Sequence, residues 1–441
     1  MLNIKKVILL IGDLTCFYLA LGLTLLIRYS YDIELWLRHF WPFTIIYLLW
    51  VIVFYIAGLY ELTLARNNLD FYSLLLEAFI VNATIAVAFF YFIPYYGITP
   101  KTNLFLDLLL IAGLLSVWRQ AFNYSVKNIA VPNKVLFVGD NKEINQIIEK
   151  INNFPQLGYQ VAEKIKPEDI KTSFDVLEKT NKQGIKIIVT SLDPSHDQKL
   201  VQSLYQCLPL KVSFYDLPSF YEKVFGKVPL SNIGELWFLE NLTEGQKNFY
   251  EAAKRVFDII AALTLGIISL PFYPLIALII KSDSRGSVFY TQKRIGLEGQ
   301  IFTVIKFRTM TEAAEKDGVK WANHQDHRIT KFGRFMRKTR IDELPQLLNI
   351  LAGQMSFIGP RPERTEFVKQ LEKEIPYYQV RHIIKPGLSG WAQVNFHYGA
   401  SVEDSVEKLQ YELYYIKHRS FILDLSIVLK TIKIVLKRGG R

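Results

Sequence analysis

Long apolar stretches dominate the first 127 residues of the chain. Four of them contain 19 to 28 residues each and hold few charges. A helix of about 20 apolar residues is long enough to cross the hydrocarbon core of a bilayer. The pattern therefore predicts a transmembrane four-helix region at residues 1–127. The four stretches are residues 7–27, 42–60, 71–98 and 103–126.

Basic residues flank these stretches unevenly. They precede the first stretch, lie in the second loop and follow the fourth stretch, and all three places share one side of a membrane crossed four times. Cytoplasmic loops carry an excess of Lys and Arg, so we expect that side to be the cytoplasm. Arg28 and Arg38, in the first loop, weaken the bias. The flanking residues are Lys5, Lys6, Arg66, Lys127 and Lys134.

Three acidic residues, Asp13, Glu77 and Asp107, lie inside the apolar stretches. Ionisable groups at membrane depth mark functional sites in some proteins. Polar contacts at helix ends or between helices are the favoured interpretation here.

Short apolar runs alternate with helical patterns between residues 133 and 243. Such alternation is typical of a parallel sheet covered by helices, so we expect a Rossmann-like domain at residues 132–245. The dinucleotide fingerprint G-x-G-x-x-G is absent, because only Gly139 follows the first run. A structural or regulatory role is therefore favoured over a dinucleotide-dependent enzyme. The predicted strands are residues 134–138, 185–189 and 211–215, and the predicted helices are residues 143–151, 176–183 and 198–206.

A fifth apolar stretch, residues 256–280, holds one charged residue, Asp258. Pro271 and Pro274 break its middle, since each removes a backbone hydrogen bond of a helix. Basic residues flank both ends, which favours both ends on the cytoplasmic side. We therefore expect a re-entrant membrane helix at residues 251–281, and a fifth, kinked span is the alternative. The flanking residues are Lys254, Arg255, Lys281 and Arg285.

An acidic pair, Asp342 and Glu343, follows a basic segment. The spacing of the next four leucines predicts a helix with one buried face that begins near Asp342, with Pro345 in its first turn. The positive end of that helix and the nearby cations would lower the pKa of a carboxylate and keep it charged, to attack a substrate or bind a metal ion. An ordinary acidic N-cap is the alternative. The leucines are Leu344, Leu347, Leu348 and Leu351.

Cations close to this pair are candidates for phosphate binding. Residues 287–310 alternate in polarity and predict a hairpin, on which Lys306 and Arg308 share one strand face. Arg361 lies in the proline-bracketed loop 355–363, which would hold a bidentate phosphate clamp at low entropic cost. A solvated strand edge is the alternative for the two hairpin cations.

Two more segments close the chain. Residues 385–395 form a second loop rich in Gly and Pro. Residues 424–437 predict an amphipathic helix, which suits an anionic membrane surface or, as the alternative, docking in a domain core. Its basic face carries Lys430, Lys433 and Lys437.

The charge balance narrows the choice of partners. The 441-residue chain has a net charge of +11, and half of its residues are hydrophobic. Residues 281–340 contain 14 Lys and Arg against 6 Asp and Glu. The positive potential of this segment would attract a phosphorylated substrate or anionic lipid. Nucleic acid is not expected in a membrane-embedded chain. Cys16 and Cys207 lack the spacing of a metal site or disulfide framework, which fits a reducing compartment.

In their order along the chain, these features resemble the bacterial sugar transferases called monotopic phosphoglycosyl transferases, or polyprenyl-phosphate hexose-1-phosphate transferases. Residues 246–441 resemble their α+β monotopic catalytic domain with its re-entrant helix. The four spans and the Rossmann-like domain resemble the large members. The motifs that carry the resemblance are Lys254–Asp258, the proline-broken helix, Val288–Gly296, Lys306–Met310, Asp342–Leu347, Gly359–Pro362 and Lys385–Asn395.

The resemblance implies an activity and a place for it. A sugar-1-phosphate would pass from a UDP-sugar to undecaprenyl (polyprenyl) phosphate through a covalent phosphosugar-aspartyl intermediate, with release of UMP. This is the initiating step of exopolysaccharide, capsule or O-antigen synthesis, at the cytoplasmic face of the bacterial inner membrane. Membrane lipid would surround the anchors, and the sugar, the pathway and the formation of a homodimer stay open.

The resemblance also assigns roles to residues. Asp342 would be the nucleophile, and Glu343, together with Asp342, would bind Mg²⁺. Lys306, Arg308, Arg337 and Arg361 are the expected phosphate contacts. Arg340 departs from the family pattern, in which small polar residues are common before the pair. It would add a phosphate contact or face solvent.

Two other functions remain as alternatives. A non-catalytic scaffold or nucleotide sensor would carry a decayed site, but the acidic pair and its cations are intact. A multi-span phosphoglycosyl transferase would act through the N-terminal helices, but these lack an acidic loop cluster that would bind Mg²⁺.

Overall fold

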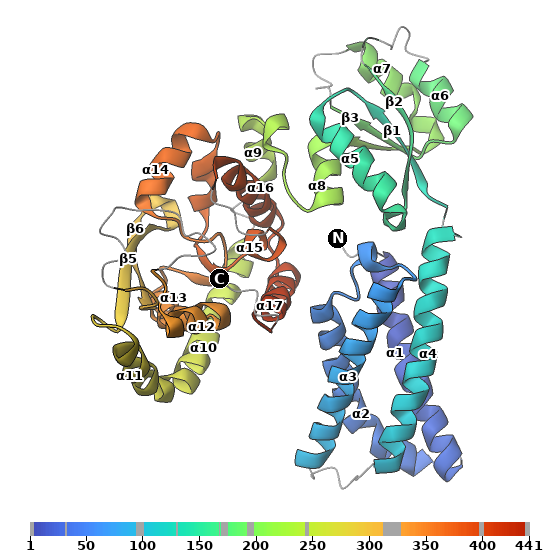
Figure 1. Cartoon of the computed structure of the whole chain (residues 1–441). Helices are drawn as coiled ribbons and strands as arrows, with labels where there is room; N and C mark the ends of the chain where they lie inside the picture. Colours follow the sequence, from blue (N-terminus) through green and yellow to red (C-terminus); the bar gives the residue numbers. More distant parts are fainter. Residues whose placement is uncertain are drawn as a thin grey trace. The chain divides into compact units, whose positions relative to one another are not determined.

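The computed structural model describes residues 4–30, 33–93, 101–128, 131–166, 168, 175–191, 198–242, 247–311, 328–396 and 401–436. The chain divides into two compact units, Met1–Asp216 and Leu217–Arg441 (Figure 1). Each unit has hydrophobic cores of its own. The predicted boundaries near residues 130 and 245 stay predictions.

The first unit begins with four long apolar helices. Their positions agree with the four stretches found in the sequence, and aromatic side chains such as Phe17, Trp50 and Phe54 fill the core between them. Five helical stretches of the described chain are long and apolar enough to cross a membrane, these four and residues 248–283. The four helices are α1 (Ile4–Tyr29), α2 (Ile33–Ala57), α3 (Leu69–Phe92) and α4 (Lys101–Asn128).

Polar contacts between helices account for two of the three acidic residues in these helices. Arg119 Nε on α4 donates to Asp13 Oδ1 on α1 at 3.0 Å, and both side chains are fully buried. Tyr47 on α2 donates its hydroxyl to Asp107 Oδ2 at 3.1 Å. Glu77 on α3 is exposed. The favoured interpretation is therefore confirmed for Asp13 and Asp107.

A four-stranded parallel sheet follows α4, with strand order β2-β1-β3-β4. The sequence pattern missed β2, because its residues are half-buried and mixed in polarity. A Cβ on Gly139 would lie 1.9 Å from Ser191 Oγ, so the glycine is needed for the turn itself. The elements are β1 (Asn133–Val138), α5 (Lys142–Asn153), β2 (Tyr159–Ile165), α6 (Asp175–Gln183), β3 (Ile187–Thr190), α7 (Gln198–Gln206) and β4 (Ser213–Asp216).

The second unit combines helices with two small sheets. The predicted hairpin is present as the antiparallel pair β5 (Phe289–Ile295) and β6 (Ile301–Phe307). The short strands β7 (Ser356–Ile358) and β8 (Gly387–Ser389) pair in parallel. The other elements are α8 (Leu217–Phe225), α9 (Glu235–Asn241), α12 (Lys331–Thr339), α13 (Leu347–Leu351), α14 (Thr365–Glu374), α15 (Trp391–Asn395), α16 (Val402–His418) and α17 (Phe421–Leu436).

The fifth apolar stretch forms two helices, α10 (Asn248–Ser269) and α11 (Tyr273–Asp283). A 3-10 turn, Leu270–Phe272, separates them, with Pro271 inside the turn and Pro274 in the first turn of α11. The two helices meet at an angle at this turn (Figure 1). Their outer side chains are apolar and exposed, including Phe257, Ile267 and Leu278.

Candidate active site

The acidic pair lies in a 3-10 helix, Ile341–Gln346, between α12 and α13. The predicted helix that begins near Asp342 is present, but the turns that contain Pro345 are 3-10 and the α-helix covers Leu347–Leu351. The predicted leucine face is confirmed for Leu344, Leu347 and Leu351, which lie in one core or pack against it. It is wrong for Leu348, which is 59% exposed. The tight turn brings Asp342 and Glu343 inward together, and both are buried.

Three cations converge on one oxygen of Glu343. Arg361 Nη2 lies 2.7 Å, Arg340 Nη1 3.3 Å and Lys306 Nζ 3.4 Å from Glu343 Oε1. Burial alone would raise the pKa of this carboxyl, but the positive charges of Arg361, Lys306 and Arg340 hold it well below its usual range. Glu343 is thus charged at neutral pH, and Arg340 faces the pair.

Asp342 is in a different electrostatic state. Its Oδ1 is buried and has no hydrogen-bond partner among the described residues. Burial, followed by the negative charge of Glu343, raises the pKa of Asp342 to about 6, against the attraction of Lys306, Arg337 and Arg340. The expectation of a lowered pKa is therefore wrong for Asp342 and right for Glu343. Lys306, Arg340 and Arg361 contact Glu343 directly, and the charges of Lys306, Arg337 and Arg340 act on the pKa of Asp342.

Lys306 connects the hairpin to the pair. It lies near the end of β6, and burial lowers the pKa of its ammonium group to about 8, although the charge of Glu343 opposes this shift. A lysine with that pKa is mostly protonated at pH 7 and loses its charge in mildly alkaline solution.

Arg337 lies on α12 beside the pair. Its Nε donates to Thr309 Oγ1 at 2.9 Å. A Cβ on Gly333 would come within 2.2 Å of the Thr309 carbonyl oxygen, so the glycine lets α12 approach the chain after β6.

Arg308 does not join the pair. Its guanidinium donates to the carbonyl oxygens of Ser284 and Arg285 at 2.7 Å each, at the end of α11. No hydrogen bond or ion pair of the described residues connects it to Asp342 or Glu343. β6 ends at Phe307, so the strand alternation that placed Arg308 beside Lys306 does not continue that far.

The loop that carries Arg361 is held by close backbone packing. A Cβ on Gly359 would lie 2.4 Å from the Lys385 carbonyl oxygen, so the loop and the segment around β8 approach each other closely. Arg381 Nη2 donates to the Arg361 carbonyl oxygen at 2.8 Å and forms an ion pair with Glu412 at 2.7 Å. Arg381 and Glu412 were not predicted, because no sequence pattern links two residues 31 positions apart.

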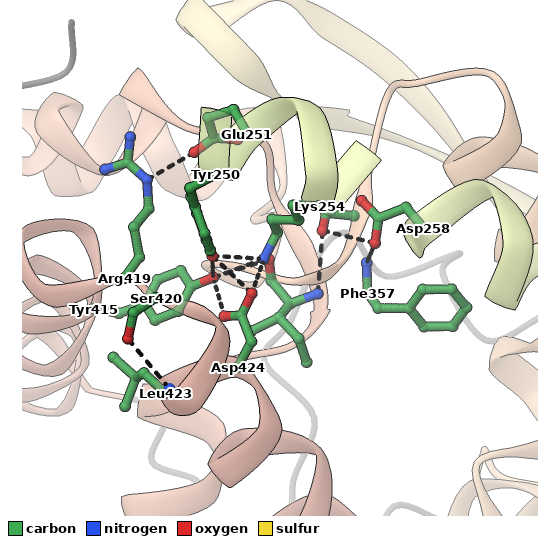
Figure 2. Close-up of polar contacts among 12 residues, drawn as sticks. Tyr250, Glu251, Lys254, Asp258, Phe357, Tyr415, Arg419, Ser420, Leu423 and Asp424 are labelled. Carbon is green, nitrogen blue, oxygen red and sulfur yellow. Dashed lines mark hydrogen bonds and ion pairs between the residues drawn. The ribbon is translucent and has the colours of Figure 1, made fainter. Parts of the chain in front are cut away.

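A buried polar network fixes the start of α10 (Figure 2). Lys254 Nζ lies 2.8 Å from Asp424 Oδ2 on α17 and 2.8 Å from the Tyr415 hydroxyl. One turn further along α10, Asp258 Oδ1 accepts hydrogen bonds from Ser356 Oγ and the Phe357 amide, both at 3.1 Å. The apolar helix is thus joined to α17 and to β7, which leads into the Arg361 loop.

α17 has two distinct sides. On one side Ile427 is fully buried and Lys430 Nζ donates to Asn395 Oδ1 at 3.0 Å. On the other side Ile422 and Leu436 are 68% and 71% exposed. Docking in the domain core is therefore observed, and contact of the exposed apolar side with a membrane surface stays a prediction. Lys437 lies outside the described residues.

Among the described residues there is no group of three or more His, Cys, Asp or Glu side chains that could hold a metal ion. The pair itself offers carboxylate oxygens, including the unpartnered Asp342 Oδ1.

Comparisons with known proteins find relatives among sugar phosphotransferases. A phosphotransferase of Aeromonas hydrophila, UDP-N-acetylgalactosamine-undecaprenyl-phosphate N-acetylgalactosaminephosphotransferase, is 40% identical over 241 residues, covering 54% of this chain and 55% of that protein. The undecaprenyl-phosphate glucose phosphotransferase of Komagataeibacter xylinus is 32% identical over 312 residues, 68% of this chain and 58% of that protein. The matches thus span little more than half the length of these two relatives.

A third relative is matched over more of its length. The UDP-glucose:undecaprenyl-phosphate glucose-1-phosphate transferase of Escherichia coli is 30% identical over 341 residues, covering 71% of this chain and 69% of that protein. The family model described as "Bacterial sugar transferase" matches residues 249–438, which contain the acidic pair and every cation around it. The chain belongs to the bacterial sugar transferase family.

Proposed function

We propose that this chain transfers a sugar-1-phosphate from a UDP-sugar to undecaprenyl phosphate, giving undecaprenyl-diphospho-sugar and UMP. One observation carries the proposal most: a buried, unpartnered carboxyl oxygen of Asp342 lies next to Glu343, on which Lys306, Arg340 and Arg361 converge. Relatives named for this reaction, with N-acetylgalactosamine or glucose as the sugar, support it.

The proposed route has two displacements at the same phosphorus atom. In the first, an Asp342 carboxylate oxygen bonds to the sugar-bearing phosphorus as its bond to the bridging diphosphate oxygen breaks, and UMP leaves with that oxygen. In the second, an undecaprenyl phosphate oxygen attacks the same phosphorus and frees Asp342. The surrounding cations stabilise the charge that develops on the leaving oxygen. A covalent intermediate lets two bulky substrates use one site in turn.

Mg²⁺ fits this residue set. Magnesium is usually bound by one or two carboxylates together with substrate phosphates and water, so a third protein ligand is not required. Glu343 and Asp342 Oδ1 are the groups that would hold it. The bound ion would offset the repulsion between the diphosphate and the carboxylates. Arg337 and Arg361 would contact the same phosphates, whereas the position of Arg308 gives it no such role.

We also propose that α10 and α11 enter the membrane from the cytoplasm and return to it. Arg255 near the start of α10 donates to the carbonyl oxygens of Ile350 and Leu351. At the end of α11, Asp283 Oδ2 accepts the Phe332 amide at 2.9 Å. Both ends are thus bound to the same unit, which supports a re-entrant helix over a single membrane crossing.

We propose the rest of the topology from the apolar helices and the charge pattern of the sequence. α1 to α4 would form a four-helix anchor in the inner membrane, and the parallel sheet would be a Rossmann-like domain in the cytoplasm. The product would begin an exopolysaccharide, capsule or O-antigen glycan.

The test uses the full-length protein in a defined detergent with undecaprenyl phosphate, Mg²⁺ and a panel of UDP-sugars. We expect UMP release that requires the lipid phosphate and is fastest with one sugar, together with transfer of a radioactive sugar phosphate to the lipid. Heat-inactivated protein serves as the control. No UMP release with any UDP-sugar of the panel would overturn the proposal.

The pKa values of the site predict a bell-shaped pH dependence of kcat/KM for the free enzyme. Asp342, with a pKa of about 6, must be deprotonated to attack, so the rate falls as the pH drops below about 6. Lys306, with a pKa of about 8, must be protonated to stabilise the leaving oxygen, so the rate falls above about pH 8. UMP release measured between pH 5 and pH 10 checks both limbs. A rate that stays constant up to about pH 10 would exclude the assigned role of Lys306.

A further inference from the structure

The outer edge of β6 is completed by a side chain rather than by a third strand. β5 and β6 form a two-stranded sheet, so one edge of β6 has no strand partner among the residues that the structure describes. There Asn349 Nδ2 donates to the Thr303 carbonyl oxygen at 2.7 Å, and Asn349 Oδ1 accepts the Ile305 amide at 3.2 Å. A carboxamide carries the same donor and acceptor as a peptide group. The Asn349 side chain therefore takes the place of a neighbouring strand.

The orientation of this amide is fixed by its partners. Asn349 is 3% exposed. Its Nδ2 also donates to Gln354 Oε1 at 2.8 Å, which leaves Oδ1 as the group that faces the Ile305 amide. Neither a hydroxyl nor a carboxylate offers both partners at this spacing, and a buried donor or acceptor without a partner costs about 1–3 kcal/mol.

The two backbone groups that Asn349 binds belong to residues three positions and one position before Lys306. Asn349 itself lies on α13, which directly follows the 3-10 helix of Asp342 and Glu343. The carboxamide therefore connects the strand that bears the lysine to the segment that bears the acidic pair. We propose that Asn349 is a positioning residue, which sets the distance between the Lys306 ammonium group and the two carboxylates. This inference rests on the proposed function.

Electrostatics and packing of the site support this assignment. Lys306 Nζ lies 3.4 Å from Glu343 Oε1, at the outer limit of a hydrogen bond, so a small shift of β6 would separate them. No other side chain in the described part of the chain bonds to the backbone of Thr303 or Ile305. Apolar contacts of Phe302 and Val304 with Leu347 and Ile350 bring the two segments together, but such contacts are not directional.

The test compares Asn349→Ala and Asn349→Asp with Val368→Ala in the full-length protein. Val368 on α14 is fully buried in a different core, so its truncation lowers stability without touching β6. Asn349→Asp keeps the volume and the acceptor but loses the donor. We expect both Asn349 variants to lower kcat about tenfold or more, with the KM for the UDP-sugar changed less than about threefold.

The kinetic parameters separate positioning from stability. We expect the kcat of Val368→Ala to stay within about threefold of wild type below its melting temperature, because β6 keeps its place in that variant. Asn349 variants with kcat within about twofold of wild type, or an equal loss of kcat in Val368→Ala, would overturn the inference. If Asn349→Ala does not fold, Asn349→Asp decides alone. Wild-type protein without UMP release would instead overturn the proposed function.

Discussion

Asp342→Asn is expected to abolish UMP release and labelling of the protein by a radioactive sugar phosphate, with a loss of about 10,000-fold or more in kcat. Asparagine has the same shape but no carboxylate oxygen that could attack phosphorus. Asp342 Oδ1 makes no hydrogen bond in the described chain, so little folding energy depends on it. The melting temperature should stay within about 3 °C of wild type. Residual turnover within tenfold of wild type would exclude Asp342 as the nucleophile.

Two companion variants make this result specific. Glu343→Gln removes the charge on which Arg361, Arg340 and Lys306 converge, so it should raise the Mg²⁺ concentration needed for half-maximal rate. An unchanged Mg²⁺ titration would remove Glu343 as a ligand. Arg308→Lys is the matched control, because Arg308 binds carbonyl oxygens at the end of α11. It should lower the melting temperature while kcat changes little.

Regular hydrophobic patterns predicted the regular parts of the fold. The four apolar stretches became α1 to α4, and the alternating residues around Lys306 became the β5–β6 hairpin. These elements are long enough for the hydrophobic pattern to repeat over several helical turns or several cross-strand residue pairs. β2 was missed because its polarity pattern is weak. The leucine spacing after Asp342 also predicted a helix that the chain forms only in part, because the residues around Pro345 adopt a 3-10 turn.

The composition of the site was easier to predict than its electrostatics. Motif spacing identified Asp342, Glu343, Lys306 and Arg361, and the geometry brings the last three together. Motif spacing did not reveal that Glu343, rather than Asp342, holds the cations. The choice between the two carboxylates depends on their burial and on distances of 2.7 to 3.4 Å to the cations, which only the tertiary structure sets. Asn349 escaped notice for the same reason, since an asparagine at the edge of a strand has no sequence signature.

The segment before the family match is expected to be part of the catalytic unit. Removing residues 217–245 from the second unit should make the remaining fragment unstable, although the family model begins at residue 249. Val228 is fully buried and Trp237 is 9% exposed, and both lie in the main core of this unit. The Trp391 Nε1 of the Gly/Pro-rich loop donates to the Gly226 carbonyl oxygen at 2.8 Å. Deletion would leave this donor and the core without their partners.

The expected loss is large compared with the stability of a domain. Truncating one buried Trp costs about 3–5 kcal/mol, and a whole domain is stable by about 5–15 kcal/mol. A fragment of residues 246–441 should therefore melt at least about 10 °C below a fragment of residues 217–441 in the same detergent, and should lose UMP release in parallel. Differential scanning fluorimetry measures the first quantity.

Point variants in the full-length chain separate loss of the core from loss of chain length. Trp237→Ala should lower the melting temperature of the second unit by several degrees, whereas Leu239→Ala should leave it nearly unchanged, because Leu239 on the same helix is 78% exposed. Equal melting temperatures for the two fragments would show that α8 and α9 rest on the catalytic fold without stabilising it. If the shorter fragment melts at the lower temperature, active fragments of this protein must include residues 217–245, because the loop of Trp391 depends on Gly226 for its position.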